Sequence, residues 1–475
     1  ADRRPQTASA LGGLGAAGVT ALLKVGETKP IPEGKPENYY SKRVEDNLGQ
    51  LNGTEALAAF AEAYRNAGDN EKQRLQLISQ LLRYRSEIKK KDAGVFKEGA
   101  NDEELEAAKR GECVAAFATV MGKAGFEDLK TWSTSTEAIV RAQAVTGMGS
   151  TAIPLSKSTP VLKAVLNDRH MDFFKARENA LEGLKRSSDK ELLAVFIESM
   201  DPEVEKSENV RNRALLSLRG FQLSSGCSEE DMIEAVEARL ADEAELVRSE
   251  ALNLYVRMAL NLSEGEKAGK AVEAGLIDKA TSVRKIAFQN VSAVRQNLDT
   301  AKVLTAALAE EEISLRSVAV IALANLEVLP EDEGKMQAVV DLCFKVLSES
   351  SSNRNAQELI SKAVDNAPKI SRKTIKAVKT KISELKASGE MRSMVGWISV
   401  LMSLDDSSYG EEIKKLAELD NSELRKKCVA YLVEFGGEDD INWLRSLRDR
   451  SDSAAGRVRG DIESAMKKLE AKLEN

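Results

Sequence analysis

The chain has very few of the residues that build metal centres and disulfide frameworks. It holds one histidine, His170, and four cysteines among 475 residues. Cys113, Cys227, Cys343 and Cys428 are separated by at least 85 residues, which suits neither a zinc site nor a set of disulfides. We therefore predict no metal and no cofactor, and expect each cysteine to pack as a small apolar side chain. His170 is expected to lie in a solvated turn.

Aromatic residues, prolines and long apolar runs are also scarce. Only 4% of the residues are aromatic although 42% are hydrophobic, so Ala, Leu and Val supply the core, as in tightly packed helices. Four of the nine prolines fall within the first 36 residues, which leaves the rest of the chain free to be helical. No run approaches the roughly 18–20 apolar residues of a membrane span. We predict no membrane span.

The charge balance and the N-terminus bear on partner and compartment. The chain has 69 basic and 76 acidic residues, a net charge of −7. Proteins that bind nucleic-acid backbone are usually basic, so a nucleic-acid partner is not expected. The chain begins with Ala1 rather than Met, which indicates a removed leader or a trimmed chain. Residues 8–25 are apolar but too rich in glycine for a good signal core. The expectation is a soluble protein, either cytoplasmic or exported after removal of a leader.

A β-branched or leucine residue followed by arginine recurs at a nearly fixed interval. Successive copies are 70, 37, 36, 32, 109 and 34 residues apart. The two long intervals correspond to two and three repeats of about 36 residues, and degenerate copies near residues 176, 354 and 391 fill them, which gives about ten units. Such a period is typical of helical solenoids, in which each unit contacts only its neighbours. The arginines are Arg141, Arg211, Arg248, Arg284, Arg316, Arg425 and Arg459.

Each unit is predicted to be a helical hairpin. In one unit, residues 241–244 form the turn, and Val247, Ala251 and Leu254 give the second helix one apolar face. An acidic residue at the turn can cap this helix, and the arginine can reach back to it or to the acid of the next unit. We predict a stacking ladder; arginines that engage a ligand remain the alternative. The acid precedes the arginine by six positions in Asp242 and Arg248, Asp278 and Arg284, and Glu310 and Arg316.

Three segments are predicted along the chain. Residues 1–40 contain a partial repeat and a linker with Pro and Gly. Residues 41–135 form an irregular helical section or degenerate repeats. Residues 136–475 form the solenoid, which ends in a helix rich in Lys and Glu, as a terminal cap requires.

The acid, the Val-Arg pair and an alanine four residues after the valine resemble HEAT repeats. Ala251, Ala287 and Ala319 are that alanine, and residues 10–15 have a similar character. The likeness is nearest to the short bacterial type found in phycobilisome lyases. It is clear over residues 140–475, moderate over 1–25 and weak over 42–130. The resemblance implies an α-solenoid that acts as a scaffold, adaptor or cargo carrier and holds a partner in its concave groove.

Families that place catalysis on such repeats fit the sequence poorly. Deoxyhypusine hydroxylases look similar in their repeats but bind di-iron through paired His-Glu motifs, which one histidine cannot supply. HEAT-like DNA glycosylases use a basic groove, in contrast to the net charge of −7. Hydrolase elbows, phosphate loops and dinucleotide fingerprints are absent from the sequence, and no residue set supports bilin handling. We predict that the chain is not an enzyme and has no catalytic residues.

Two features are candidate partner contacts. A basic strip lies on the same predicted helix as an apolar stripe. The strip is either the solvated face of that helix or a docking strip for an acidic protein or a phosphate-bearing surface. The adjacent Phe173 and Phe174 are hard to bury together in a long turn. Trp397 lies in an apolar run and is expected in the core. The basic strip comprises Lys369, Arg372, Lys373, Lys376 and Lys379, and continues to Lys381 and Lys386.

The leading interpretation is a non-enzymatic protein–protein interaction scaffold, a curved all-α solenoid of HEAT-like hairpins. The second helices of successive units would line the concave surface and hold a protein partner. Two alternatives remain, a structural subunit of a large and perhaps exported assembly and an accessory lyase-type enzyme that uses the groove. The sequence leaves the partner's identity and the oligomeric state open.

Overall fold

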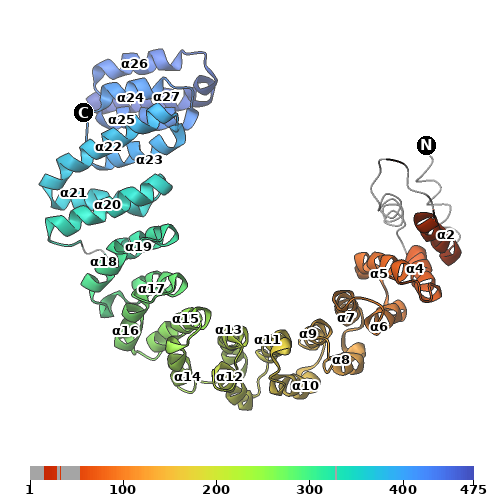
Figure 1. The fold of residues 1–475 in the computed structure, drawn as a ribbon. Helices are drawn as coiled ribbons and strands as arrows, with labels where there is room; N and C mark the ends of the chain where they lie inside the picture. The colour runs from red at the N-terminus through yellow and green to blue at the C-terminus, as the bar shows by residue number, and fades with distance from the viewer. Residues whose placement is uncertain (1–14, 29–32, 34–53, 327–328, 475) are drawn as a thin grey trace. The chain divides into compact units, whose positions relative to one another are not determined.

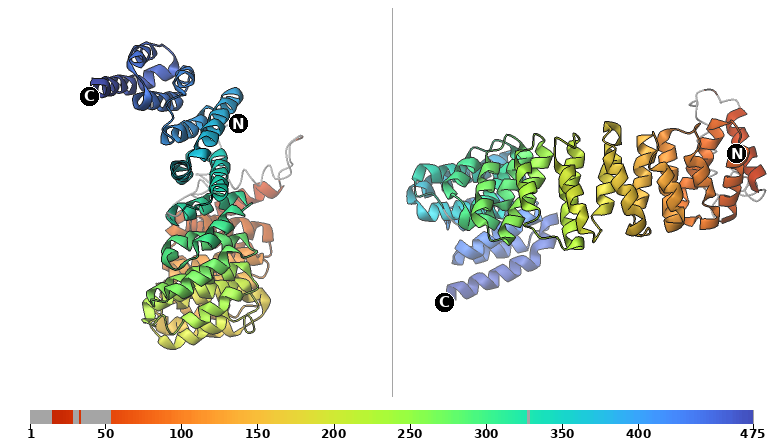
Figure 2. Two further views of the ribbon diagram at one scale, coloured as in Figure 1. Left: turned by 90° about the vertical axis from the view of Figure 1, so that its left-hand side faces the viewer. Right: turned by 90° about the horizontal axis from the view of Figure 1, so that it is seen from below.

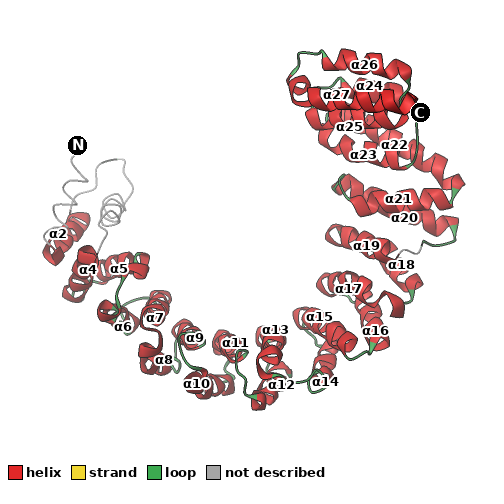
Figure 3. Cartoon of the chain, turned by 180° about the vertical axis from the view of Figure 1, so that it is seen from behind, coloured by secondary structure: helices red, strands yellow, loops and turns green. Residues whose placement is uncertain are grey.

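The computed structural model describes residues 15–28, 33, 54–326 and 329–474. Over these residues the chain consists of α-helices, short 3₁₀ turns and loops, without a β-strand (Figure 3). It divides into two compact units, an N-terminal unit that ends at Ala251 and a C-terminal unit that begins at Leu252. The boundary falls inside α15 (Glu245–Asn261). The predicted partial repeat before residue 15 and most of the predicted linker lie outside the described residues.

In the N-terminal unit the helices alternate between two rows (Figure 1). One row holds α7, α9, α11 and α13, which contact one another in that order. The other row holds α8, α10 and α12, and each of these first helices packs against the second helix that follows it. The helices of this unit are α2 (Gly15–Thr28), α4 (Thr54–Asn66), α5 (Glu71–Arg83), α6 (Gly94–Ala100), α7 (Ala107–Met121), α8 (Phe126–Trp132), α9 (Ala138–Met148), α10 (Leu155–Asn167), α11 (Phe174–Leu184), α12 (Leu193–Met200), α13 (Glu208–Ser225) and α14 (Ile233–Glu237).

The C-terminal unit follows the same scheme, which Figure 2 shows from two further directions. Its second helices α17, α19, α21, α23, α25 and α27 contact one another in order, and each pairs with the first helix before it. The predicted fold class, an all-α solenoid of helical hairpins, is confirmed. The helices are α16 (Gly265–Leu276), α17 (Thr281–Val294), α18 (Thr300–Leu308), α19 (Ile313–Leu326), α20 (Glu333–Glu349), α21 (Arg354–Asn366), α22 (Pro368–Ser388), α23 (Met391–Ser403), α24 (Gly410–Ala417), α25 (Ser422–Phe435), α26 (Glu438–Arg448) and α27 (Ser453–Glu474).

Helix α17 illustrates how the apolar spacing builds a hairpin. Val283, Ala287 and Val291 stand four residues apart and are at most 3% exposed, so they form one buried face. Small residues let the paired helix approach closely. A Cβ added to Gly275 of α16 would lie 3.0 Å from the Cβ of Ala287. The alternation of small and large side chains therefore sets the spacing within the hairpin.

Ion pairs join second helices to the turn of the next hairpin. Arg177 pairs with Glu205 at 2.7 Å and Arg211 pairs with Asp242 at 2.8 Å, and all four side chains are at most 1% exposed. The acid lies 26 to 33 residues after the arginine in the printed sequence. We call this set of pairs the ladder. Its other members are Arg74–Asp102, Arg110–Glu137 and Arg141–Asp168 in the N-terminal unit, and Arg284–Glu310, Arg316–Glu349 and Arg425–Asp452 in the C-terminal unit.

The acid of a ladder pair also fixes its own turn. Oδ1 of Asp242 accepts a hydrogen bond from the backbone N–H of Ala244 at 2.9 Å. The backbone carbonyl of Asp242 accepts a hydrogen bond from Nη1 of Arg248 at 2.8 Å. The turn is therefore bound through its carboxylate by the preceding hairpin and through its carbonyl by its own second helix. The turn at Glu205 is built in the same way.

The predicted ladder arginines differ in their surroundings. Arg248 donates to two carbonyls of its own turn, whereas Arg459 is exposed and has no carboxylate at ion-pair distance among the described residues. The degenerate copies near residues 354 and 391 rely on close backbone contact instead. A Cβ added to Gly396 of α23 would lie 1.8 Å from the carbonyl oxygen of Ser351. Glycine is therefore required where α23 passes the turn before α21.

Candidate functional site

The candidate site is built on α22, whose ends are marked by its sequence. Pro368 stands in the first turn, where its missing N–H leaves no hydrogen bond unmade. Gly389 ends the helix at φ +77°, a left-handed conformation that favours glycine. Val378, Ile382 and Leu385 are at most 5% exposed and hold the helix onto its neighbours. The remaining faces of α22 are left for solvent or for a partner.

The outward side of α22 is strongly basic. The helix carries seven Lys and Arg residues and a single acid, Glu384. Arg372, Lys373 and Lys376 are exposed, and none has a carboxylate of the described residues at ion-pair distance. Lys369 is 84% exposed, and its nearest carboxylate is 3.7 Å away. We call these four residues the basic face. The paired cations are Lys369 with Glu333, Lys379 with Asp406, Lys381 with Glu384 and Lys386 with Glu412.

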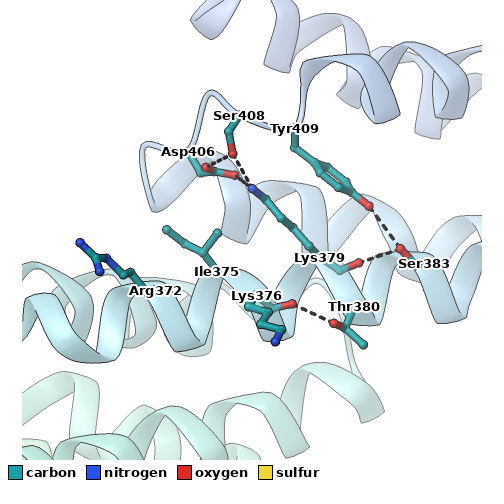
Figure 4. A pocket seen from close by; sticks show the side chains of 9 residues that line it. All are labelled: Arg372, Ile375, Lys376, Lys379, Thr380, Ser383, Asp406, Ser408 and Tyr409. Atoms are coloured by element: carbon teal, nitrogen blue, oxygen red, sulfur yellow. Dashed lines mark hydrogen bonds and ion pairs between the residues drawn. The ribbon is translucent and has the colours of Figure 1, made fainter.

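One groove of about 580 Å³ lies between α22 and the loop that follows α23 (Figure 4). Lys379 extends along it, with Nζ 2.7 Å from Oδ2 of Asp406 and 2.6 Å from Oγ of Ser408. The ring of Tyr409 lies 5.4 Å from the same ammonium. Lys379 is therefore already neutralised within the molecule. This loop groove is lined by Arg372, Ile375, Lys376, Lys379, Thr380, Ser383, Asp406, Ser408 and Tyr409.

The loop that carries Asp406 is held in place by a buried tyrosine. The hydroxyl of Tyr431 on α25 donates to the carbonyl oxygen of Asp406 and accepts the N–H of Tyr409 at 3.3 Å. Burial raises the pKa of Tyr431 to about 12, so the hydroxyl keeps its proton. Asp405 stands at φ +51°, which turns the chain sharply at the end of α23. The carboxylate of Asp406 therefore has a fixed position beside Lys379.

A second groove of about 570 Å³ lies on the other side, between α20 and α22. The aromatic part of its wall is formed by Phe344 and Trp397, whose rings meet edge to face at 5.2 Å. Trp397 is 2% exposed, and its indole N–H has no hydrogen-bond partner among the described residues. Lys376 and Thr380 line both grooves. This helix groove is lined by Asp341, Phe344, Lys345, Ser348, Lys373, Lys376, Ala377, Thr380, Lys381, Glu384 and Trp397.

Phe173 and Phe174 lie in the N-terminal unit, apart in sequence from the basic face. Phe173 ends a short 3₁₀ turn and Phe174 begins α11, and both are half-buried. The guanidinium of Arg141 lies 3.6 Å from the ring centre of Phe173, a cation–π contact. Phe173 is thus packed against a ladder arginine. The predicted partner contact at this pair stays a prediction.

An apolar groove between α16 and α18 was not predicted from the sequence. It has a volume of about 620 Å³, and Ile277 at its edge is 81% exposed. An ion pair between Lys302 and Glu273 at 2.5 Å crosses its rim, and the hydrogen bond from Lys302 lowers the pKa of Glu273. In the sequence, the only sign of this groove is the pair of adjacent apolar residues Leu276 and Ile277 at the end of α16. Leu276 is buried, which leaves its neighbour outside.

His170 and the four cysteines are not clustered among the described residues. Over those parts of the chain, no three His, Cys, Asp or Glu side chains come together in an arrangement that could hold a metal ion. His170 is exposed in its turn. Burial raises the pKa of Cys113, Cys343 and Cys428 to about 12, so these thiols stay protonated and are poor nucleophiles. No described helix is both long and apolar enough to cross a bilayer.

Comparisons with known proteins bear on the architecture. No protein-family model matches the chain, and no curated protein matches it by sequence. Solved structures are similar to it in fold, and two of them illustrate the likeness. One is karyopherin Kap121p bound to the extreme C-terminus of the protein phosphatase Cdc14p, with 10% identity and a TM-score of 0.53 over 96% of this chain and 62% of that one.

The other is a structure in which Kap95p binding induces the switch loops of RanGDP to adopt the GTP-bound conformation. Its identity to this chain is 11% and its TM-score 0.52, over 99% of this chain and 69% of that one. The chain thus spans about two thirds of the length of Kap121p and of Kap95p. At such low identity the likeness concerns the fold alone, a solenoid of paired helices.

Proposed function

We propose that the chain is a non-enzymatic protein-interaction scaffold or adaptor. The observation that carries the proposal is the contrast between two sets of cations. The ladder arginines are paired with acids inside the stack of hairpins. Arg372, Lys373 and Lys376 are instead exposed beside two grooves, and none of them has an acid of the described residues at ion-pair distance. Charges that the fold does not use are available to a partner.

The fold comparisons support this proposal by analogy. The Kap121p and Kap95p structures hold, by their own descriptions, the C-terminus of Cdc14p in one case and RanGDP in the other. A solenoid presents long rows of helices with side chains that need not serve the core. By analogy, this chain would hold a protein partner on the concave side of its solenoid. The proposal includes that the repeats of this chain are of the short bacterial type found in phycobilisome lyases.

Affinity capture tests the proposal. The purified chain is immobilised, exposed to an extract of its native source and washed at low and at moderate salt, and the retained proteins are identified and cross-linked to it. A stoichiometric protein partner with cross-links to one helix face is the expected result. Retention of small molecules alone, with steady turnover of one of them, would overturn the scaffold in favour of the enzyme. Only further copies of the chain would favour the structural subunit.

A further inference from the structure

We propose that α22 binds an extended acidic peptide segment of a partner protein. The carboxylates of the segment pair with Arg372, Lys373 and Lys376, and one apolar side chain of it enters the helix groove. This inference rests on the proposed scaffold function and specifies the kind of partner. It uses one helix of the C-terminal unit with the grooves on its two sides.

The spacing of the cations fits an extended chain. Arg372 and Lys376 stand four residues apart on α22, one turn of helix or about 6 Å along its axis. Two residues of extended peptide span about 6.6 Å, so acids at alternate positions can meet both cations. Lys373 is three residues from Lys376 and faces the helix groove. An acidic residue further along the peptide can reach it.

The molecule itself contains an example of the contact. Asp406 places a carboxylate oxygen 2.7 Å from Nζ of Lys379, on the same helix and beside the same groove. That pair lies between the helix and a loop held by Tyr431. Figure 4 shows Lys376 and Arg372 along the same stretch of α22. Neither has a carboxylate of the described residues at ion-pair distance. Carboxylates of the partner would pair with Arg372 and Lys376 in the way that Asp406 pairs with Lys379.

The helix groove adds an apolar component to the recognition. Phe344 is half-buried, and its ring packs on Trp397. Ala377 is small and lies on α22 next to Lys376, which leaves room above the rings. Aromatic and apolar side chains that fill such a depression dominate many peptide interfaces. A segment with one Phe or Leu among its acids therefore fits better than a purely acidic one.

Carboxylates in the helix groove favour a peptide over a nucleic acid. Asp341 and Glu384 line the groove and are exposed. A nucleic-acid strand carries a charge about every 3.4 Å, so some phosphates would lie beside these acids. A peptide can place neutral residues there and acids only on the basic face. The site therefore selects a discrete pattern of charge.

The test uses the full chain and a fluorescent 12-residue peptide with Glu at alternate positions and one central Phe. Binding is followed by fluorescence anisotropy. The double variant Arg372→Glu/Lys376→Glu is compared with Lys467→Glu/Lys468→Glu, which makes the same change of charge at two exposed lysines of α27. We expect the first to weaken binding about tenfold or more and the second less than about twofold. Wild-type binding should weaken as salt shortens the screening length from about 10 Å at 0.1 M to about 3 Å at 1 M.

The apolar contact has a separate test. Phe344→Ala should weaken binding of the Phe-containing peptide. Binding of a peptide with Ala at that position should stay almost unchanged, as in a double-mutant cycle. Circular dichroism and melting of each variant establish that it is folded. If a charge reversal unfolds the chain, Arg372→Gln/Lys376→Gln takes its place.

Three outcomes would overturn the inference. They are equal binding by both charge-reversal variants, equal loss of both peptides in Phe344→Ala, and displacement of the peptide by a single-stranded oligonucleotide at matched charge and concentration. The captured protein distinguishes the two levels of the proposal. If it still binds Arg372→Glu/Lys376→Glu, the α22 site is wrong and the scaffold stands. If the wild type captures no protein, both are wrong.

Discussion

Arg211 and Asp242 lie 31 residues apart in the chain and form a two-pronged ion pair inside the N-terminal unit. The guanidinium donates to both carboxylate oxygens, at 3.0 Å through Nε and 2.8 Å through Nη2. Both side chains are at most 1% exposed, so neither charge has water as an alternative partner. Removal of one partner would leave the other charge buried and uncompensated.

We predict that Arg211→Ala lowers the free energy of unfolding by about 3–5 kcal/mol, because it leaves the buried Asp242 without its counter-charge. Arg459→Ala in the last hairpin is the control. We expect it to change the free energy of unfolding by no more than about 0.5 kcal/mol, because Arg459 is exposed. Urea unfolding followed by circular dichroism measures both. Arg284→Ala should fall between them, because the side chain of Arg284 is 21% exposed. Equal shifts for all three would show that the ladder does not stabilise the stack.

The ladder also predicts a loss of stability in acid. Burial by itself would raise the pKa of Glu310, but the hydrogen bonds from Arg284 and from the N–H of Glu312 outweigh it and lower the pKa below its ordinary value. A depressed pKa contributes stability above the unfolded value, about 4.3, which is lost as the pH falls through the folded value. Melting temperature should drop below about pH 4 in the wild type. In Glu310→Gln it should be lower at pH 7 and fall less on acidification; parallel curves would contradict this role.

Gly396 gives a prediction about close packing. A Cβ at this position would lie 1.8 Å from the carbonyl oxygen of Ser351, so Gly396→Ala must displace α23 or the turn before α21. We expect a loss of about 1–3 kcal/mol or more. Gly460→Ala on α27 is the matched control, because nothing lies within 4 Å of its added Cβ and alanine favours a helix by about 0.5–1 kcal/mol. Thermal unfolding of both variants measures the two effects. If both variants are stabilised, the turn before α21 can move aside without loss of stability, and the prediction is wrong.

The cysteines allow a chemical check on the packing. Burial raises the pKa of Cys113, Cys343 and Cys428 to about 12, and all three are fully buried. In the native chain at pH 8 these thiols should react with an aromatic disulfide reagent far more slowly than in urea, where all are accessible. Rapid native labelling of any of the three, mapped by peptide mass spectrometry, would show that its hairpin opens readily.

The repeat was predictable because stacking demands the same few residues at the same place in each hairpin. The Val-Arg pair marks the start of second helices such as α9, α13 and α25, where the valine or leucine is buried and the arginine reaches the next turn. Arg74 and Arg110 make the same pairs but follow Gln73 and Lys109, so the motif does not reveal them. Their ion pairs depend on the fold rather than on a neighbouring residue type.

The candidate site was predictable only in part. The basic strip of α22 is evident from its sequence, because lysines and arginines alternate with a buried apolar stripe. Which of its cations remain unpaired is not evident. Lys379 meets Asp406 only because Tyr431, more than twenty residues later, holds the loop against α22. The helix groove likewise depends on Phe344 and Trp397, which belong to neighbouring helices.

Where a turn is bound by arginines from both sides, the hairpin that it opens can be exchanged as a module. The turn of Asp242 accepts one arginine of the preceding hairpin through its acid, and the turn of Glu205 does the same. The turns built in this way therefore present the same pair of groups to their neighbours. A whole hairpin can then be duplicated or removed within a unit, and the new neighbours still find a matching arginine and acid. Changes of about 36 residues preserve these joints, whereas shorter insertions inside a turn break one. The chain is thus suited to evolve in length by whole hairpins while the helix that carries the basic face stays intact.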